Sequence, residues 1–333
     1  MTPLLPFQVV FSSRDKQMSR STISTFQLME RFPDADSARR YLESRLWKDG
    51  VKCPKCKAGR RVTARKGGFY RCNVCPLDFT VRTGTIFERS HVPLQKWLYA
   101  MYLLVTARKG ISSMQLAKEC GITQKSAWFV LQRLREACAN HLSKLDGTVE
   151  IDEFYVGGRE ANKHTRARLR YRVSRSDDKT PVMAMRERGG RTRALPLAGT
   201  GALSIERAVR ENIEAGSTLH TDEYAGYKWL TPDYKHETVN HGREEYWRNG
   251  VTTNGVESVF AVMRRGLHGV YHKASKKHLA RYVNEFAWRL NEGNVTRHTL
   301  ERLDSFVDAV TGRQITYKRL VASNDKDPYP HPL

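Results

Sequence analysis

The sequence contains no apolar run of the roughly 18–20 residues that a membrane-spanning helix requires. Its best candidate, residues 97–107, is followed at once by Arg108, and we interpret it as a buried core helix. The first residues show no basic segment followed by an apolar stretch, which argues against a secretory signal. There is also no repeat of fixed period and no low-complexity tract. We therefore expect a cytoplasmic globular protein that does not use a membrane.

Acidic residues are in short supply relative to basic ones. The chain has 35 Asp and Glu against 57 Lys and Arg, for a net charge of +22. A field of this sign attracts polyanions, and it predicts a nucleic-acid phosphate backbone as partner. The alternative is that the basic residues only keep the protein soluble. With 333 residues, of which 40% are hydrophobic and 28% charged, the chain can form two or three folded domains.

Cysteines are few, six in all, and four of them form two Cys-x-x-Cys pairs. The pairs are Cys53 with Cys56 and Cys72 with Cys75, at a spacing typical of a zinc ribbon. Each pair on a tight turn aims two thiolates at one point, and four sulfurs complete a tetrahedral shell around one structural Zn²⁺. Redox or unrelated free thiols are the alternatives. We expect the ribbon, which is rich in Lys and Arg, to touch DNA, although small exposed modules are often basic in any case.

Helical periodicity follows the cysteine pairs. Residues 112–118 are amphipathic, Gly121 supplies a turn, and Thr123 can cap a second helix that runs to Arg135. This layout is that of a helix-turn-helix, in which the second helix enters the major groove and would present Gln124 and Lys125. A helical hairpin that only packs on its neighbours is the alternative.

The second half of the chain alternates strand and helix patterns. We expect strands at 149–156, 182–185, 193–197, 218–221 and 236–239, and helices at 205–213, from 254, and at 277–291. One face of the last helix is apolar and is predicted to be core. The polar, proline-containing segment after Thr311 is expected to lack structure.

Three acidic residues occupy positions suited to metal-dependent phosphodiester chemistry. Asp152 lies inside an apolar strand, Asp222 directly follows a short strand, and Glu257 lies in the first turn of a helix. Such chemistry can use two divalent ions held by carboxylates from rigid elements, and Mg²⁺ favours oxygen ligands. Each residue also has an ordinary interpretation: an outward-facing strand residue, a turn cap and a solvated helix residue, respectively.

Several longer motifs accompany these acids. They are VEIDEFYVGG at 149–158, HTDEYAGY at 220–227, TNGVESVF at 253–260, YHKASKKH at 271–278 and RYVNEFAWR at 281–289. As a set they resemble the DDE catalytic domain of insertion-sequence transposases that carry an N-terminal zinc ribbon. The resemblance implies a multi-domain α/β chain: zinc ribbon, helix-turn-helix, then an RNase H-like mixed sheet flanked by helices.

The resemblance also implies roles for individual residues. It assigns Asp152, Asp222 and Glu257 to binding two Mg²⁺ (or Mn²⁺) ions, and a basic catalytic role to Arg264, two turns after Glu257. Glu153 and Glu223 adjoin the proposed ligands, but strand alternation argues against two neighbours binding metal from the same face.

The implied activity is a bacterial DNA transposase that cleaves transposon ends and joins the 3′-OH to target DNA. Its partners would be the double-stranded terminal inverted repeats and the target DNA, bound by a homodimer or larger assembly at the nucleoid. Two other functions stay open: a non-catalytic zinc-ribbon and helix-turn-helix regulator that uses only residues 1–145, and an RNase H-like recombination nuclease.

Further DNA contacts are expected in two basic segments. Within the basic run 159–175 we expect a DNA clamp made of Lys163, Arg166, Arg168 and Arg170, unless the run is only a solvated loop. Arg243, Trp247 and Arg248 precede the Glu257 helix, where Trp247 can stack on an unpaired base or instead close a core. The expected domains are a partly disordered segment with a short helix (1–46), the ribbon (47–92), the helix-turn-helix region (93–146), the catalytic domain (147–295) and a tail (296–333).

Overall fold

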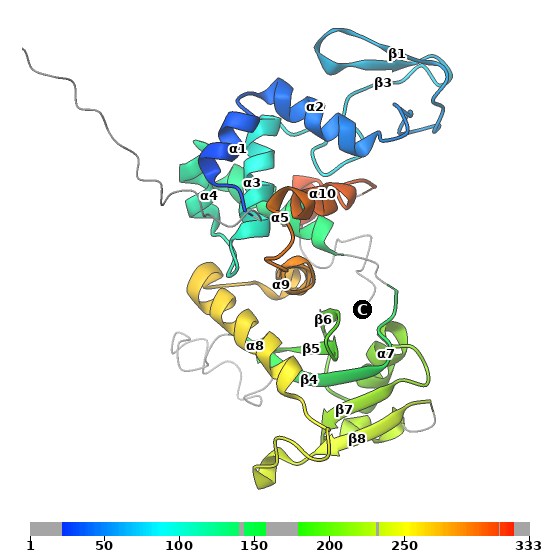
Figure 1. The fold of residues 1–333 in the computed structure, drawn as a ribbon, viewed down its shortest axis with the longest axis vertical. Helices are drawn as coiled ribbons and strands as arrows, with labels where there is room; N and C mark the ends of the chain where they lie inside the picture. The colour runs from blue at the N-terminus through cyan, green and yellow to red at the C-terminus, as the bar shows by residue number, and fades with distance from the viewer. Residues whose placement is uncertain (1–21, 140–142, 158–178, 231–232, 313, 323–333) are drawn as a thin grey trace, which may run out of the picture.

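The computed structural model describes residues 22–139, 143–157, 179–230, 233–312 and 314–322. Helices and a zinc-ribbon module form its upper part in Figure 1, and a β-sheet with its own helices forms the lower part. Helix α9 (Leu279–Glu292) lies between the two parts. No helix in the described ranges is both long and apolar enough to cross a membrane.

Two short helices precede the ribbon. They are α1 (Thr25–Arg31) and α2 (Ala35–Leu46), and each begins at a capping box, on Ser24 and on Asp34. A capping box satisfies free backbone N–H groups at a helix start, so both helices have fixed beginnings. The ribbon is an antiparallel sheet of β1 (Val62–Ala64), β2 (Tyr70–Cys72) and β3 (Asp78–Phe79). Its hairpin turns at η2 (Lys66–Gly68), where Gly67 and Gly68 have positive φ.

The predicted helix-turn-helix layout is confirmed. After α3 (Leu94–Thr106), helix α4 (Ser113–Cys120) ends at Gly121 with φ 58°, and Thr123 caps α5 (Gln124–Cys138). Only the first turn of α5 is exposed, because most of its side chains from Ala127 onward are buried. Helix α5 is therefore a central core helix that presents its N-terminal end to solvent.

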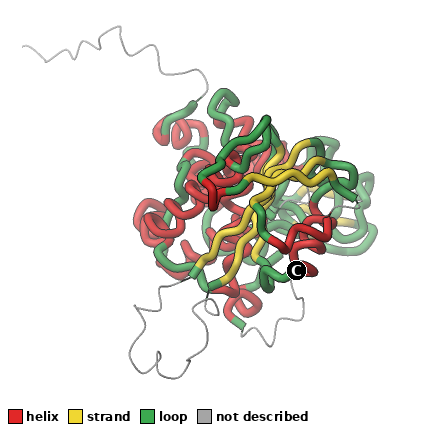
Figure 2. The backbone as a smooth tube through the Cα atoms, turned by 90° about the horizontal axis from the view of Figure 1, so that it is seen from below, coloured by secondary structure: helices red, strands yellow, loops and turns green. Residues whose placement is uncertain are grey.

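The larger sheet has five strands in the order β6-β5-β4-β7-β8. Its antiparallel part joins β4 (Thr148–Val156), β5 (Thr180–Glu187) and β6 (Thr192–Pro196), and β7 (Thr218–Asp222) and β8 (Lys235–Val239) extend it in parallel. This is the mixed sheet of an RNase H-like fold. Figure 2 shows the strands crossing the molecule with helices on either side.

Helices cover both faces of this sheet. Helix α7 (Ala202–Asn212) packs Ile205, Ala208 and Val209 on one face. On the other face lie α8 (Asn254–Gly266) and α9. Short turns connect these elements: η4 (Ala225–Leu230), η5 (His241–Arg243), the π-helical η6 (Leu267–Tyr271) and η7 (Lys276–His278).

Side chains along β4 alternate between the two faces. Val149 and Ile151 belong to the core beneath α7, whereas Phe154 belongs to the core beneath α8. Because successive strand residues point to opposite faces, Asp152 shares the α8 side with Phe154, and Glu153 shares the α7 side with Ile151. This alternation places the predicted metal ligand under the helix that carries Glu257.

Two helices lie in the C-terminal tail, and the second of them contradicts the prediction that the residues after Thr311 lack structure. Helix α10 (Thr299–Asp308) packs Leu303, Phe306 and Val307 into the core formed by α1 to α5, and α11 (Tyr317–Val321) follows it. The apolar residues of α10 recur at helical spacing, but ten residues of mostly polar sequence gave a weak pattern. The division into five domains stays a proposal, and residues of α10 share one core with the helix-turn-helix region.

Candidate active site and zinc centre

The four cysteines converge as the sequence predicted. Their Sγ atoms all lie within 4.8 Å of one another, with Cys53 and Cys75 at 3.5 Å and Cys56 and Cys72 at 3.5 Å. A tetrahedral Zn²⁺ with Zn–S of about 2.3 Å places its sulfurs about 3.8 Å apart, so the cluster fits the ion. Backbone N–H groups of Cys75 and Val74 lower the pKa of Cys72 to about 6, which favours the thiolate that zinc binds.

Removing zinc is expected to unfold the ribbon. Its own core is small, consisting of Cys53, Cys72 and Phe79 with a few half-buried neighbours, so the metal supplies much of its stability. A strong chelator should unfold residues 50–80, which changes the circular dichroism spectrum of the protein, and should release one zinc ion per chain. Cys72→Ser should abolish zinc binding, and Cys120→Ser, at a buried cysteine in α4, should retain it. A spectrum that a strong chelator leaves unchanged would contradict this assignment.

The three predicted acids lie at one end of the larger sheet. Strands β4 and β7 are parallel neighbours, with Glu150 opposite His220, so Asp152 and Asp222 occupy equivalent positions two residues further along. Asp222 ends β7 and accepts a hydrogen bond from the Tyr224 N–H at 3.1 Å. Glu257 lies in the first turn of α8, on the face of the sheet that Asp152 shares.

The pKa of Asp152 is affected by the charges of the other two acids. Burial, together with the negative charges of Asp222 and Glu257, raises the pKa of Asp152 to about 6. Among the described residues, however, only the four cysteines form a cluster of potential ligand atoms within 4.8 Å of one another. The structure therefore brings the acids into mutual electrostatic range without joining their oxygens at one point.

His241 joins this group from η5. Its Nε2 lies 3.6 Å from Glu257 Oε1 and 2.9 Å from the hydroxyl of Thr253. Sequence reasoning did not identify this contact. No spacing rule relates a histidine in a polar loop to a glutamate on the following helix.

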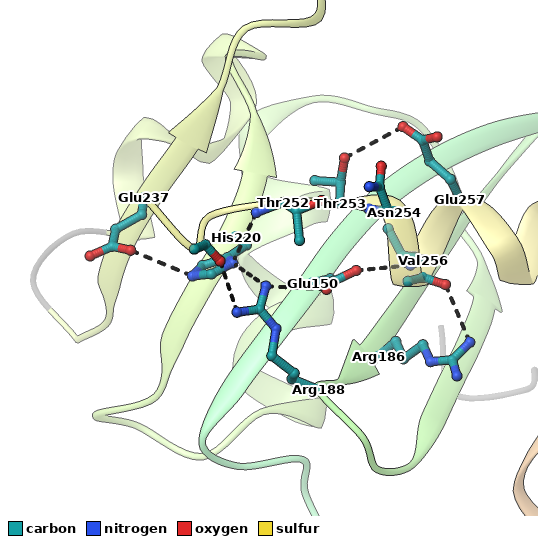
Figure 3. A network of polar contacts seen from close by, with 12 residues as sticks. Glu150, Arg186, Arg188, His220, Glu237, Thr252, Thr253, Asn254, Val256 and Glu257 are labelled. Atoms are coloured by element: carbon teal, nitrogen blue, oxygen red, sulfur yellow. Dashed lines mark hydrogen bonds and ion pairs between the residues drawn. The ribbon is translucent and has the colours of Figure 1, made fainter. Parts of the chain in front are cut away.

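A buried network fixes where α8 begins, and Figure 3 shows it. Glu150, only 4% exposed, accepts a hydrogen bond from the Val256 N–H at 3.0 Å. Arg186 donates to the Gly255 carbonyl at 3.3 Å and to the Ser258 hydroxyl at 3.0 Å. Glu150 is two residues from Asp152 on the same face of β4. Strand β4 therefore carries both a proposed metal ligand, Asp152, and the carboxylate that anchors the helix bearing Glu257.

The same network extends to β7 and β8. Arg188 lies 3.5 Å from Glu150 and 3.2 Å from His220 Nδ1, and the Thr252 N–H donates to that nitrogen at 3.4 Å. Two donors at Nδ1 leave the ring proton on Nε2, which faces Glu237 at 3.5 Å. Burial lowers the pKa of His220, in keeping with a neutral ring that acts as a fixed connector.

Gly255→Ala should disturb the start of α8. A Cβ at position 255 would lie 2.5 Å from Glu150 Oε2, so the anchoring carboxylate or the helix must shift. Overpacking of this kind costs about 1–3 kcal/mol of unfolding free energy, to be measured by urea denaturation. Gly199→Ala, where nothing lies within 4 Å, is the control and should have little effect. Equal unfolding free energies for the two variants would show that the network does not constrain the helix.

The neighbouring acids differ from the predicted ligands in their surroundings. Glu153 accepts a hydrogen bond from the Tyr227 hydroxyl on the α7 side, and burial raises the pKa of Glu153 to about 7. Glu223 is exposed. Arg264 lies over the Phe154 ring, with Cζ 5.6 Å from the centroid, at the end of α8 remote from Glu257. Its assignment as a catalytic group stays a prediction.

The predicted DNA contacts that the structure describes come from two segments. In the first turn of α5, Gln124 donates to Ser113 at 2.9 Å and Lys125 lies over the Tyr317 ring at 4.6 Å. In the loop before α8, Arg243 is exposed, Trp247 is 64% exposed, and Arg248 lies 3.7 Å from Glu245. The alternative that Trp247 closes a core is therefore wrong. The proposed clamp residues lie outside the described residues; they are Lys163, Arg166, Arg168 and Arg170.

Comparisons with known proteins agree with this arrangement. The family model of the ISXO2-like transposase domain matches residues 144–291, and that of the transposase zinc-ribbon domain matches residues 33–77. An uncharacterized protein in transposable element ISH50 of Halobacterium salinarum is 33% identical over 258 residues, which cover 73% of this chain and 86% of the relative.

Two solved structures of Mos1 complexes are more distant. The Mos1 strand transfer complex is 13% identical with a TM-score of 0.26, and covers 66% of this chain and 79% of that chain. A pre-cleavage Mos1 transpososome is 11% identical with a TM-score of 0.17, and covers 66% of this chain and 80% of that chain.

Proposed function

The chain belongs to the insertion-sequence transposases with an N-terminal zinc ribbon, and from this premise we propose that it cuts transposon ends and joins the freed 3′-OH to target DNA. The observation that carries the proposal is the grouping of Asp152, Asp222 and Glu257 at one end of β4, β7 and α8. Three carboxylates on rigid elements are what divalent-metal phosphodiester chemistry requires.

We propose that these acids hold two ions rather than one. Two ions about 3.5–4 Å apart, each about 2.1 Å from its oxygens, allow ligands on opposite ions to lie up to roughly 8 Å apart. Asp152, Asp222 and Glu257 are the residues that would hold them. When bound, a pair of Mg²⁺ or Mn²⁺ ions supplies charge neutralisation at the attacking and leaving oxygens.

The chain itself orients the reacting groups. His241 and Thr253 hold the Glu257 carboxylate from one side, and Glu150 fixes the start of the helix beneath it. In the first step water attacks the phosphorus at the transposon end, and the bond to the 3′ oxygen breaks and leaves a 3′-OH. That hydroxyl then attacks a target phosphodiester in line, and the target's own 3′ oxygen leaves.

We assign DNA recognition to the ribbon and to the exposed first turn of α5. In the helix-turn-helix motif the N-terminal residues of the second helix contact base edges, and this is the part of α5 that is free of the core. The net charge of +22 supplies the sequence-independent attraction to phosphate. Because two transposon ends must be brought together, we propose a dimer or larger assembly, acting in the bacterial cytoplasm at the nucleoid.

The test is strand cleavage of a labelled transposon-end duplex with Mg²⁺ or Mn²⁺. The wild-type protein should nick the end and form joined products with a target duplex. Asp222→Asn should bind the same duplex and leave it uncut. Full activity of Asp222→Asn would refute the assignment of the site, and short inverted repeats flanking the gene distinguish transposition from a recombination nuclease.

A further inference from the structure

A basic cleft opens where β4 and α8 end. Its volume is about 970 Å³, Phe154 lies in its wall, and the residues that line it include five basic or histidine side chains: Arg264, His268, His272, Lys273 and Lys276. Among the described lining residues none is acidic. In this part of the chain, no described carboxylate forms an ion pair with Lys273 or Lys276. Among the described residues, the lining of the cleft is therefore positively charged.

We propose that this cleft binds the sugar–phosphate backbone of the DNA strand being cut, on one side of the scissile phosphate. The inference rests on the proposed function and specifies where the substrate strand runs. The partner chemistry follows from the charge: a polyanion is the complement of a cleft whose charged lining side chains are all cationic. Phosphate contacts of this kind position a strand without reading its sequence.

The position of the cleft supports this assignment. Phe154 lies two residues beyond Asp152 on the same face of β4, which is about 6.5–7 Å along the strand. Arg264 lies seven positions after Glu257 on α8, about 10.5 Å along the helix. The cleft thus begins within about one nucleotide's reach of the acids and continues away from them. A strand with its phosphate at the acids passes directly into the cleft.

Contacts of the preceding residue, Tyr271, hold the wall of the cleft that bears His272 and Lys273. Tyr271 donates a hydrogen bond to the buried Glu285 carboxylate at 2.6 Å and packs edge-on against Tyr282, with ring centroids 4.9 Å apart. Gly110 lets this ring approach closely, because a Cβ there would lie 2.0 Å from the Tyr271 hydroxyl. Because the backbone that carries His272 and Lys273 is held in place before the DNA strand binds, the entropic cost of binding is lower.

The local backbone is unusual at the same place. Helix α8 passes into the π-helical turn η6, and His272 then adopts φ 55° and ψ −37°, which is rare for a residue with a side chain. Such conformations persist only where surrounding contacts enforce them, and they concentrate at functional sites. Here the enforcing contacts are those of Tyr271, so the strained turn keeps His272 and Lys273 in the wall of the cleft.

Equilibrium binding without added Mg²⁺ or Mn²⁺ tests the inference. The probe is a fluorescein-labelled oligothymidylate, titrated with the full-length protein at several salt concentrations. Lys273→Ala with Lys276→Ala should weaken binding about tenfold at low salt and reduce the slope of log K against log salt by about 1.4, since each phosphate contact on a single strand contributes about 0.7. The weakening should be equal for oligonucleotides of other sequences.

Two further proteins complete the experiment. Arg207→Ala with Arg210→Ala removes the same charge from α7, on the opposite face of the sheet, and should leave the slope near that of wild type. Lys273→Arg with Lys276→Arg should restore binding. A cleft variant that matches the α7 variant in affinity and slope overturns the inference. A protein that binds through the cleft but never cuts transposon ends overturns the proposed function instead.

Discussion

The Asp152→Asn variant is expected to lose DNA strand cleavage by on the order of 10³-fold or more, because metal-assisted charge stabilisation contributes several kcal/mol to the transition state. The fold should persist, since the amide has the size of the carboxylate and removes the buried charge and the repulsion that raise the pKa of Asp152. Binding to an end duplex should stay near wild type. The measurements are single-turnover nicking with Mn²⁺ and thermal unfolding of the two proteins.

Glu153→Gln is the matched control for this experiment. Residues 152 and 153 are adjacent in β4 but point to opposite faces of the sheet, and Glu153 is bonded to Tyr227. The amide oxygen of glutamine can accept the same hydrogen bond, so cleavage should change only a few-fold, roughly the value of one neutral hydrogen bond. The opposite pattern, with Glu153→Gln inactive and Asp152→Asn active, would shift the metal ligand by one residue.

Replacing Glu285 by glutamine is expected to lower the free energy of unfolding by about 3–5 kcal/mol, the cost of breaking a buried ion pair from one side. Glu285 is 1% exposed and lies 2.6 Å from both Arg135 and Arg289. Its removal leaves two guanidinium groups buried without a counter-charge. Urea denaturation measures the loss, and Glu211→Gln, in an exposed pair with Arg207 on α7, should cost under about 1 kcal/mol.

The same cluster makes stability depend on pH. Despite its burial, the charges of Arg135 and Arg289 lower the pKa of Glu285 to about 2, from 4.5 in an unfolded chain. Because its pKa is lower in the folded state, ionised Glu285 stabilises the fold above pH 4.5. This contribution is lost as the pH falls from 4.5 toward 2. Wild-type stability should therefore fall in this range more steeply than that of Glu285→Gln. Parallel pH profiles would show that the cluster contributes nothing to folding.

Much of the fold follows from local sequence chemistry. The Cys-x-x-Cys pairs, the cap at Thr123 and the strand at 149–156 each have a short-range physical cause, and each appears in the structure as expected. Asp152 could also be singled out, because a carboxylate within an apolar strand is costly without a purpose. The roles of the three acids came from the family resemblance and remain to be tested.

Long-range packing could not be predicted in this way. Arg135 sits in a polar helical pattern that suggests solvent, yet it is 1% exposed because its partner, Glu285, is supplied by α9. The anchoring of α8 by Glu150 likewise joins residues more than a hundred positions apart. Periodicity in a single sequence shows which face is apolar, but it does not show which distant element covers that face.

Helix α9 contributes to two hydrophobic cores. Val283 and Phe286 pack in the core beneath α8, and Trp288 packs in the other core with α3, α5 and α10. A chain shortened to residues 1–145 would lack Trp288, Leu303 and Phe306 and expose the apolar surface that they cover. Such a fragment would aggregate or be degraded instead of occupying DNA ends as a competitor. We therefore expect that a short N-terminal fragment of this protein would not serve as a stable repressor of transposition.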